Sequence, residues 1–231
     1  MWLFNKKYSL VDIGILHGFT DWHCHLLPGV DDGVRTMEEA LQILDSYEHH
    51  GVKEVWLTPH IMEDIPNTTA HLRKCFADLQ NAYKGHIALH LASENMLDSL
   101  FSQRLQQGDL LPLGNEGRHL LVETSYFNPP YDFHNFFRQI QSKGLIPVLA
   151  HPERYVYMEK REYEKLRSMN VAFQLNLTSF TGIYGEISKR KAQWLLENGF
   201  YSFYGTDTHR LASWEKVSET KQIPKGIIKL L

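Results

Sequence analysis

Apolar and polar positions along the chain follow two alternating patterns. Short runs rich in Val, Ile, Leu and aromatic residues, typical of buried strands, recur about every 26 to 35 residues. Longer stretches with apolar residues three and four positions apart, typical of amphipathic helices, fill the intervals. One strand and one crossover helix make a βαβ unit, so the pattern predicts seven parallel βα units. The predicted strands begin near Phe19, Val52, Ile87, His119, Leu145, Val171 and Phe200.

The first predicted helix has clear boundary signals. Thr36 and Glu39 have capping-box spacing, the apolar positions 40, 43, 44 and 47 form one stripe, and Gly51 stands at the end. Further helices are expected over about 68–84, 133–143, 160–169 and 188–198. No linker or low-complexity segment divides the chain, so we expect a single domain. Seven units favour a closed or nearly closed barrel, and an open doubly wound sheet is the alternative.

Composition and charge narrow the function. The 231 residues carry 24 Lys and Arg against 27 Asp and Glu, a net charge of -3, so a sequence-independent nucleic-acid binder is not expected. Cys24 and Cys75 cannot make a disulfide framework, which fits a cytoplasmic protein. The N-terminus has no apolar signal segment, and no apolar run of membrane-spanning length occurs, so direct membrane insertion is not expected. The 13 histidines are the unusual feature.

Potential metal ligands follow six of the seven predicted strands, whereas the sixth strand offers only Asn176. Functional groups of parallel α/β proteins collect beyond the carboxyl ends of the strands. Asp32, on the loop after the first strand, could reach the same place. We therefore have nine candidate metal ligands: His23, His25, Asp32, His60, Glu94, Glu123, His151, Asp207 and His209.

The spacing of these candidates favours a shared site. A single histidine at a strand end is usually structural, but residues two apart in a strand point the same way. Each of two pairs therefore directs both of its side chains at one place: His23 with His25, and Asp207 with His209. Cys24 points away from this place and is expected to be a small buried residue. Nine imidazoles and carboxylates suggest two or three ions, with manganese, iron, zinc or magnesium suited to these ligands. The positive charge of three divalent ions would exceed the negative charge of four carboxylates, so the pocket should attract an anion such as phosphate.

Arginines and aromatic residues near the predicted strand ends are candidates for substrate binding. Arg154 could hold a phosphate by two parallel hydrogen bonds, or could pair with Glu153 or another neighbour. Arg35 and Arg210 are further candidates at the mouth of the predicted barrel. The loops after the fourth to sixth strands could present a wall to an aromatic substrate or simply pack over helix ends. Their aromatic residues are Tyr126, Phe127, Tyr131, Phe133, Tyr155, Tyr157, Phe180 and Tyr184.

Five motifs in a fixed order resemble a known family. They are HCHLLPGVDDG at 23–33, TPH ending at His60, the strand ends at Glu94 and Glu123, AHPER at 150–154, and DTH at 207–209. The set resembles the polymerase and histidinol phosphatase (PHP) superfamily, and within it the bacterial metal-dependent protein tyrosine phosphatases of capsule and exopolysaccharide synthesis. The resemblance implies a distorted seven-stranded TIM-like (βα) barrel over 19–231, preceded by an extension over 1–18.

The resemblance also implies a trinuclear centre, usually of manganese, with iron, zinc, magnesium or cobalt as substitutes. His23, His25, Glu94 and Asp207 would hold one ion. Glu94, as a bridge, would hold a second ion with Glu123 and His151, and Asp32, His60 and His209 would hold the third. Arg154 matches an arginine that binds the substrate phosphate. The position of a second family arginine is Trp214 here, and Arg210 is the nearest substitute.

The implied reaction is hydrolysis of phosphotyrosine by a hydroxide held between ions. The substrate would be the tyrosine-rich tail of a bacterial tyrosine autokinase that controls capsular or exopolysaccharide synthesis. Three alternatives stay open. Two are enzymes with the same metal centre: a small-molecule phosphatase, such as a histidinol phosphatase, and a phosphodiesterase. The third is a regulator that docks a kinase tail and keeps its metals for structure.

Overall fold

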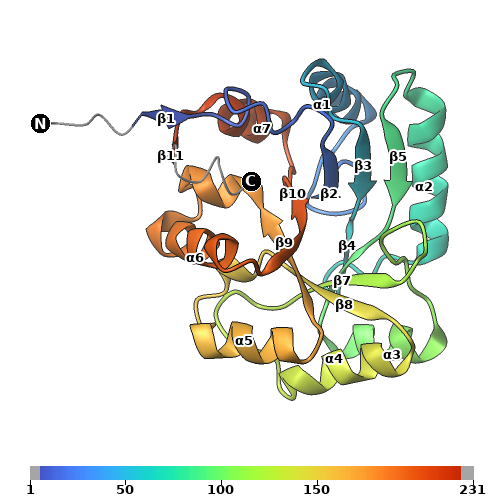
Figure 1. Cartoon of the computed structure of the whole chain (residues 1–231). Helices are drawn as coiled ribbons and strands as arrows, with labels where there is room; N and C mark the ends of the chain where they lie inside the picture. The colour runs from blue at the N-terminus through green and yellow to red at the C-terminus, as the bar shows by residue number, and fades with distance from the viewer. Residues whose placement is uncertain (1–5, 225–231) are drawn as a thin grey trace, which may run out of the picture.

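Seven parallel strands alternate with helices along most of the chain in the computed structural model, which describes residues 6–224 (Figure 1). Each strand begins within two residues of a predicted start, so the predicted βα repeat is confirmed. These strands are β2 (Thr20–Cys24), β3 (Glu54–Leu57), β5 (Ala88–Leu91), β7 (His119–Glu123), β8 (Ile146–Ala150), β9 (Ala172–Asn176) and β10 (Tyr201–Gly205).

Residues 6–224 contain seven α-helices, of which the sequence predicted five. At α1 the predicted cap is present, because the Thr36 hydroxyl accepts a hydrogen bond from the Glu39 amide at 3.2 Å. The helices α3 and α7 and the 3-10 turns η1 (Pro152–Arg154) and η2 (Leu177–Thr181) were not predicted. The α-helices are α1 (Met37–His49), α2 (Thr69–Ala82), α3 (Ser99–Gln107), α4 (Phe133–Ser142), α5 (Lys160–Ser168), α6 (Gly185–Glu197) and α7 (Leu211–Glu219).

The parallel strands are divided between two sheets. One sheet has the order β2-β3-β5, and the other has the order β10-β9-β8-β7-β6-β4. The short strands β4 (His60–Ile61) and β6 (Glu94–Met96) follow β3 and β5 after a break, and they pair with each other in the second sheet. The parallel α/β architecture is thus confirmed, whereas the hydrogen-bonded ladders do not form one continuous closed barrel in the described residues.

A narrow seam joins β2 to β10, which lie side by side in Figure 1. One isolated parallel bridge connects Cys24 with Thr208. The Asp207 amide donates to the His23 carbonyl at 2.8 Å, and the His25 amide donates to the Thr208 carbonyl at 2.9 Å. The seam therefore places the carboxyl ends of β2 and β10 against each other.

The first described residues pack against the same core as the repeats. Strand β1 (Lys7–Tyr8) pairs antiparallel with β11 (Ile223–Pro224), and Leu10 and Leu16 are fully buried. The boundary between an extension over 1–18 and a domain over 19–231 stays a prediction, and the end of that domain lies outside the described residues. None of the helices within residues 6–224 has the length and apolar character needed to cross a membrane.

Candidate metal centre

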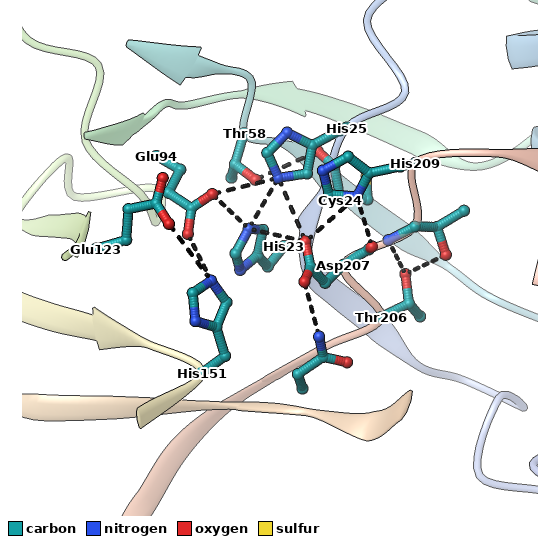
Figure 2. A network of polar contacts seen from close by, with 12 residues as sticks. His23, Cys24, His25, Thr58, Glu94, Glu123, His151, Thr206, Asp207 and His209 are labelled. Carbon is teal, nitrogen blue, oxygen red and sulfur yellow. Dashed lines mark hydrogen bonds and ion pairs between the residues drawn. The ribbon is translucent and has the colours of Figure 1, made fainter. Parts of the chain in front are cut away.

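The carboxyl ends of the parallel strands bring all nine predicted ligands together. His23 lies in β2 and His25 just after it, while His60 and Glu94 open the short strands β4 and β6. Glu123 ends β7, His151 follows β8, and Asp207 and His209 follow β10. Figure 2 shows Glu94 between Glu123 and His151 on one side and His23 and His25 on the other. All except Asp32 and His209 are buried.

The paired ligands of the seam face one another. The Nε2 atoms of His23 and His25 lie 3.1 Å apart, as expected for side chains two residues apart that aim at one place. Asp207 Oδ1 lies 3.6 Å from His23 Nε2 and 3.4 Å from His25 Nε2. These three residues offer ligand atoms that all lie within 4.8 Å of one another, which is the size of a site for one ion.

Glu94 occupies the middle of the cluster. Its Oε2 lies 3.2 Å from His23 Nε2, 3.3 Å from His25 Nε2 and 3.2 Å from His60 Nδ1. Its Oε1 lies 2.9 Å from His151 Nε2. One carboxylate thus faces four imidazoles, an arrangement suited to a bridge between cations.

His60 lies between two buried carboxylates, those of Glu94 and Glu123, and the more exposed side chain of Asp32. Its Nδ1 lies 2.9 Å from Glu123 Oε1, and its Nε2 lies 3.4 Å from Asp32 Oδ1. His209 Nε2 lies 3.5 Å from the same Asp32 oxygen, and with His25 these side chains form a further four-residue group. The groups overlap, because His23, His25, His60 and Glu94 each belong to two of them.

The donor set and its unsatisfied atoms fit divalent cations. Five buried side-chain polar atoms in residues 6–224 make no hydrogen bond of acceptable geometry, and four of them belong to the predicted ligands: His60 Nδ1, Glu94 Oε2, Glu123 Oε1 and His151 Nδ1. Buried polar atoms are normally satisfied, so this concentration indicates that another group completes the site. Imidazole nitrogens and carboxylate oxygens without thiolates suit hard or borderline ions.

The charges within the cluster also favour cations. Burial disfavours the charged form of His23, but the carboxylates of Glu94 and Asp207 outweigh this effect and raise its pKa to about 9. For Asp32, the hydrogen bond and the charge of His209 hold the carboxyl pKa well below its usual value, against the effect of burial. A divalent ion would replace the proton that the His23 imidazole otherwise takes up.

Two residues that the sequence analysis missed orient the ligands. Asp31 Oδ2 accepts hydrogen bonds from His25 Nδ1 at 2.8 Å and from the His60 amide at 2.9 Å. Gln174 Oε1 lies 2.9 Å from His23 Nδ1 and accepts from the His151 amide at 3.2 Å. Such partners fix the ring orientation of a metal-binding histidine. The paired aspartates of the VDDG motif were the only sequence signal for Asp31.

A buried polar group, not predicted from the sequence, ties the two sides of the seam together. Asp21 Oδ1 accepts from the Thr206 amide at 2.9 Å, and Asp21 Oδ2 accepts from the Thr206 hydroxyl at 2.7 Å. The Tyr47 hydroxyl donates to Asp21 Oδ2 at 3.0 Å and lies 2.9 Å from the Thr208 hydroxyl. We call Asp21, Tyr47, Thr206 and Thr208 the seam brace. It lies directly beneath the four ligands of β2 and β10.

Backbone strain is present at two ligands. His151 has φ 32° and Asp207 has φ 55°, in the left-handed region that residues other than glycine rarely adopt. Such conformations cost of order 1–3 kcal/mol each and persist where the surroundings enforce them. Here the strained backbone turns the chain sharply at the ends of β8 and β10.

Arg154 lies next to the metal ligands and is held from three sides. Its Nη1 donates to Asp207 Oδ2 at 2.6 Å, and its guanidinium lies 4.4 Å from the centre of the Tyr126 ring and 4.2 Å from that of Tyr184. Asp207 therefore divides its two oxygens between the imidazoles and Arg154. We call Tyr126, Arg154 and Tyr184 the arginine clamp. The partner of Arg154 is Asp207, whereas Glu153 bonds to Ser179 and Asn176.

A cavity of about 400 Å³ opens over the cluster and the arginine clamp. Its lining includes Asp32, His60, Glu94, His151, Asp207 and His209 together with the three clamp residues. The predicted candidates Arg35 and Arg210 are not among the lining residues. Arg210 Nη1 instead donates to the His209 carbonyl at 3.0 Å. Trp214 lines the cavity and donates from Nε1 to the Ser46 hydroxyl at 2.8 Å.

The two cysteines and the histidines His71 and His90 are not among the residues that line the cavity. Cys24 is buried in the core, as the alternation of β2 predicts, and Cys75 lies on α2. His90 stacks on Trp56 with 4.5 Å between ring centres, and His71 lies exposed on α2. Among the eight aromatic residues expected near the strand ends, Tyr126 and Tyr184 line the cavity, whereas Phe133 and Tyr157 line a separate groove.

Several known proteins are similar to this chain. Tyrosine-protein phosphatase YwqE of Bacillus subtilis is 30% identical over 199 residues, which cover 83% of this chain and 77% of YwqE. Tyrosine-protein phosphatase CpsB of Streptococcus pneumoniae is 27% identical over 212 residues, which cover 84% of each chain. The putative tyrosine-protein phosphatase CapC of Staphylococcus aureus is 24% identical over 199 residues, which cover 84% of this chain and 78% of CapC.

The fold has a counterpart among solved structures. A chain from the crystal structures of YwqE from Bacillus subtilis and CpsB from Streptococcus pneumoniae, described as unique metal-dependent tyrosine phosphatases, superposes with a TM-score of 0.75. The sequence identity is 24%, and the superposition covers 88% of this chain and 83% of the other. Residues 19–220 match the family model for capsular polysaccharide synthesis, CpsB/CapC. The chain therefore belongs to the CpsB/CapC family of capsular polysaccharide synthesis.

Proposed function

We propose that this protein is a metal-dependent protein tyrosine phosphatase, which hydrolyses phosphotyrosine to tyrosine and inorganic phosphate. The observation that carries the proposal is the convergence of nine imidazole and carboxylate side chains with Arg154 on one cavity. It occurs in a chain 30% identical to a protein named tyrosine-protein phosphatase. The PHP resemblance inferred from the motifs is in keeping with this family.

The nine side chains would hold two or three divalent ions, and manganese is our choice over iron, zinc, magnesium and cobalt. We assign His23, His25, Glu94 and Asp207 to one ion. Glu123 and His151 would hold a second ion that shares Glu94, and Asp32, His60 and His209 would hold a third. The central place of Glu94 among four imidazoles supports its bridging role. When bound, such ions lower the pKa of water to about 7 and neutralise phosphate oxygens.

Arg154 would bind the phosphate of the substrate. A guanidinium has five N–H donors in a planar fork, and the hydrogen bond to Asp207 uses one nitrogen, Nη1. The stacking tyrosines and Asp207 hold the fork in place before the substrate arrives, so less entropy is lost on binding. The proposed role of Arg154 is therefore to orient the phosphate against the metal ligands and to stabilise the charge of the transition state.

The leaving group of phosphotyrosine hydrolysis, a phenolate, needs little assistance from an acidic group of the protein. A tyrosine phenol has a pKa of about 10, so a phenolate can depart with little help from a strong acid. Tyr126 and Tyr184 border the cavity and could receive the phenol ring of the substrate. This geometry favours an aryl phosphate over an alkyl phosphate or a phosphodiester.

The proposed partner is a bacterial tyrosine autokinase whose tail carries the phosphotyrosine. The description of the family as one of capsular polysaccharide synthesis supports a partner from capsular or exopolysaccharide synthesis. We also propose a cytoplasmic location, in keeping with the free cysteines Cys24 and Cys75.

Elemental analysis of gently purified protein, combined with a panel of three substrates, tests the function. We expect bound metal, turnover of a phosphotyrosine peptide in preference to histidinol phosphate and a short oligonucleotide, and loss of turnover with a strong chelator. Added manganese should restore turnover. Full activity in thoroughly demetallated protein, or a preference for either of the other substrates, would contradict the proposal.

A His151→Gln variant tests whether the centre is catalytic or only structural. We expect hydrolysis to fall by at least about 100-fold, because the variant removes an imidazole that faces the Glu94 carboxylate. His71→Gln is the matched control, since His71 lies exposed on α2 outside the cluster. Circular dichroism should show both variants folded. Unchanged hydrolysis in folded His151→Gln would favour the docking-regulator alternative.

A further inference from the structure

Most of the exposed large apolar side chains occur in one stretch of the chain. Residues 6–224 expose six of them, and five occur between the end of β7 and the first turn of α6: Phe127, Tyr131, Val156, Ile183 and Ile187. The sixth is Val11, in the turn region before β2. Exposed apolar side chains that gather near a functional site often mark a binding surface.

Three of these side chains are neighbours of the arginine clamp in the chain. Phe127 follows Tyr126, Ile183 precedes Tyr184, and Val156 comes two residues after Arg154. Each of the three thus stands within two residues of a side chain that lines the cavity, and Ile183 lines it directly. We call Phe127, Val156 and Ile183 the apolar rim. Their exposed fractions are 68%, 52% and 51%.

The apolar rim is carried by ordered backbone. The Val156 amide donates to the Tyr126 carbonyl at 2.8 Å, which ties the loop after β8 to the loop after β7. Tyr126 and Tyr155 stack with 6.1 Å between ring centres, and Tyr155 is fully buried. Ile183 itself lines the cavity. The backbone that carries Phe127 and Val156 is therefore held in place without a ligand, which lowers the entropic cost of binding one.

We propose that the apolar rim binds the side chains next to the phosphotyrosine in a protein substrate. The enzyme would then select phosphotyrosine that stands between large apolar residues in an extended segment. The inference rests on the proposed phosphatase function and adds a preference for sequence context. With the phosphate against Arg154, the substrate chain beside the tyrosine would leave the cavity across these loops.

The size of the rim favours a peptide segment over a second copy of this chain. A stable protein interface buries about 800 Å² on each partner. An aromatic side chain buries about 150–250 Å², so one phenylalanine and two aliphatic side chains fall well short of that area. A second copy seated there would also cover the cavity. Contacts of this size suit the brief binding of a substrate that must leave after one turnover.

The test compares substrates that differ only beside the phosphotyrosine. One peptide carries leucine on both sides of the phosphotyrosine, a second carries serine there, and p-nitrophenyl phosphate reports on the aryl phosphate alone. We expect the metal-loaded protein to show kcat/KM about tenfold higher for the leucine peptide than for the serine peptide. The double variant Phe127→Ser/Val156→Ser should lower the ratio of kcat/KM for the leucine peptide to that for p-nitrophenyl phosphate by about tenfold.

Val11→Ser is the matched control, because Val11 is exposed at 37% but lies apart from the rim in the chain. Its substrate ratio should equal that of the unaltered protein. Equal kcat/KM for the two peptides, or an unchanged ratio in the double variant, overturns the inference while the phosphatase function stands. A double variant that changes the oligomeric state in sedimentation and leaves the ratio intact also overturns it. Failure of the unaltered protein on all three substrates defeats both the inference and the proposed function.

Discussion

Two neighbouring aspartates in the VDDG motif have different surroundings. The side chain of Asp31 is fully buried and accepts hydrogen bonds from His25, from the His60 amide and from the Gly33 amide. The side chain of Asp32 is 65% exposed and faces His60 and His209. A Cβ atom on Gly33 would collide with the His25 carbonyl, so glycine is needed for this turn. Asp31 thus positions ligands, whereas Asp32 is itself a candidate ligand.

An Asp31→Asn variant should bind metal about 10- to 100-fold more weakly, because the neutral amide is a poorer partner for His25 Nδ1 and has one acceptor oxygen in place of two. Competition with a chelator, followed by elemental analysis, measures the change. Asp45→Asn serves as the control, since Asp45 is exposed on α1. Equal metal retention in both variants would show that Asp31 does not position the ligands.

The two predicted arginines should respond differently to the same conservative change. Arg154→Lys loses the planar fork and the stacking on Tyr126 and Tyr184, so we expect kcat/KM for phosphotyrosine peptide to fall about 100-fold. Arg210→Lys should have a small effect, because Arg210 does not line the cavity. Steady-state kinetics on metal-loaded protein compares them. A loss in Arg210→Lys as large as in Arg154→Lys would restore Arg210 as the second phosphate ligand.

The sequence analysis identified the candidate metal ligands from their positions at the ends of predicted strands. His23 and His25 are two residues apart, as are Asp207 and His209. This spacing predicted the direction of the side chains as well as which residues are candidate ligands. The supporting residues carried no such signal. Gln174 resembles any buried strand residue in the sequence, and Tyr47 formed part of an apolar helix stripe, so their polar contacts depend on tertiary packing.

At the scale of elements, a break between β3 and β4 explains why the sheets separate. Thr58 and Pro59 interrupt the strand, and proline has no amide to donate to a ladder. Before the break, β3 pairs with β5, and after it β4 pairs with β6. The sequence analysis predicted one strand here, within a closed or nearly closed barrel or an open doubly wound sheet. The interruption instead places His60 within reach of both Glu123 and Asp32.

Two helices escaped prediction because their local signals are weak. The helix α3 has nine residues with a mostly polar sequence, and only Phe101, Arg104 and Leu105 are buried. Its start depends on the Asp98 side chain, which accepts from the Phe101 amide at 2.8 Å. The helix α7 is equally short and buries Trp214 and Val217. Both helices owe their stability to packing rather than to sequence propensity.

The seam brace should matter for the stability of the fold as well as for the centre. In Tyr47→Phe, Asp21 and Thr208 lose the hydroxyl between them, so we expect the free energy of unfolding to fall by about 1–3 kcal/mol. Urea unfolding of metal-free protein isolates this effect. Tyr83→Phe is the control, since its hydroxyl bonds to Glu48 away from the seam, and it should cost less. Equal losses would show that the brace has no special role.

Across the whole molecule, the candidate metal centre joins both sheets. Its candidate ligands include residues of β2 in the three-stranded sheet and of β4, β6 and β7 in the six-stranded sheet. Bound cations would therefore tie the sheets together more firmly than the narrow backbone seam alone. They would also offset the repulsion among four neighbouring carboxylates.

Added manganese should raise the melting temperature of metal-free protein, and the rise should grow with the manganese concentration. The reason is that a ligand that binds only the folded state stabilises the folded state. Differential scanning calorimetry across a manganese titration measures this. The Glu94→Gln variant should show a much smaller rise, since Glu94 faces four of the imidazoles. An identical rise in both proteins would place the stabilising ion elsewhere.

Asp207 has one oxygen toward His23 and His25 and the other toward Arg154 and the side-chain amide of Asn176. The Asp207 carboxylate thus couples the charge at the predicted metal ligands to the charge at Arg154. A cation drawn to Oδ1 withdraws negative charge from the arginine side, and an oxyanion drawn to Arg154 frees Asp207 to bind the cation more tightly. By thermodynamic reciprocity, each ligand strengthens the other to the same degree. Bound product phosphate would accordingly raise the affinity of the protein for its metal.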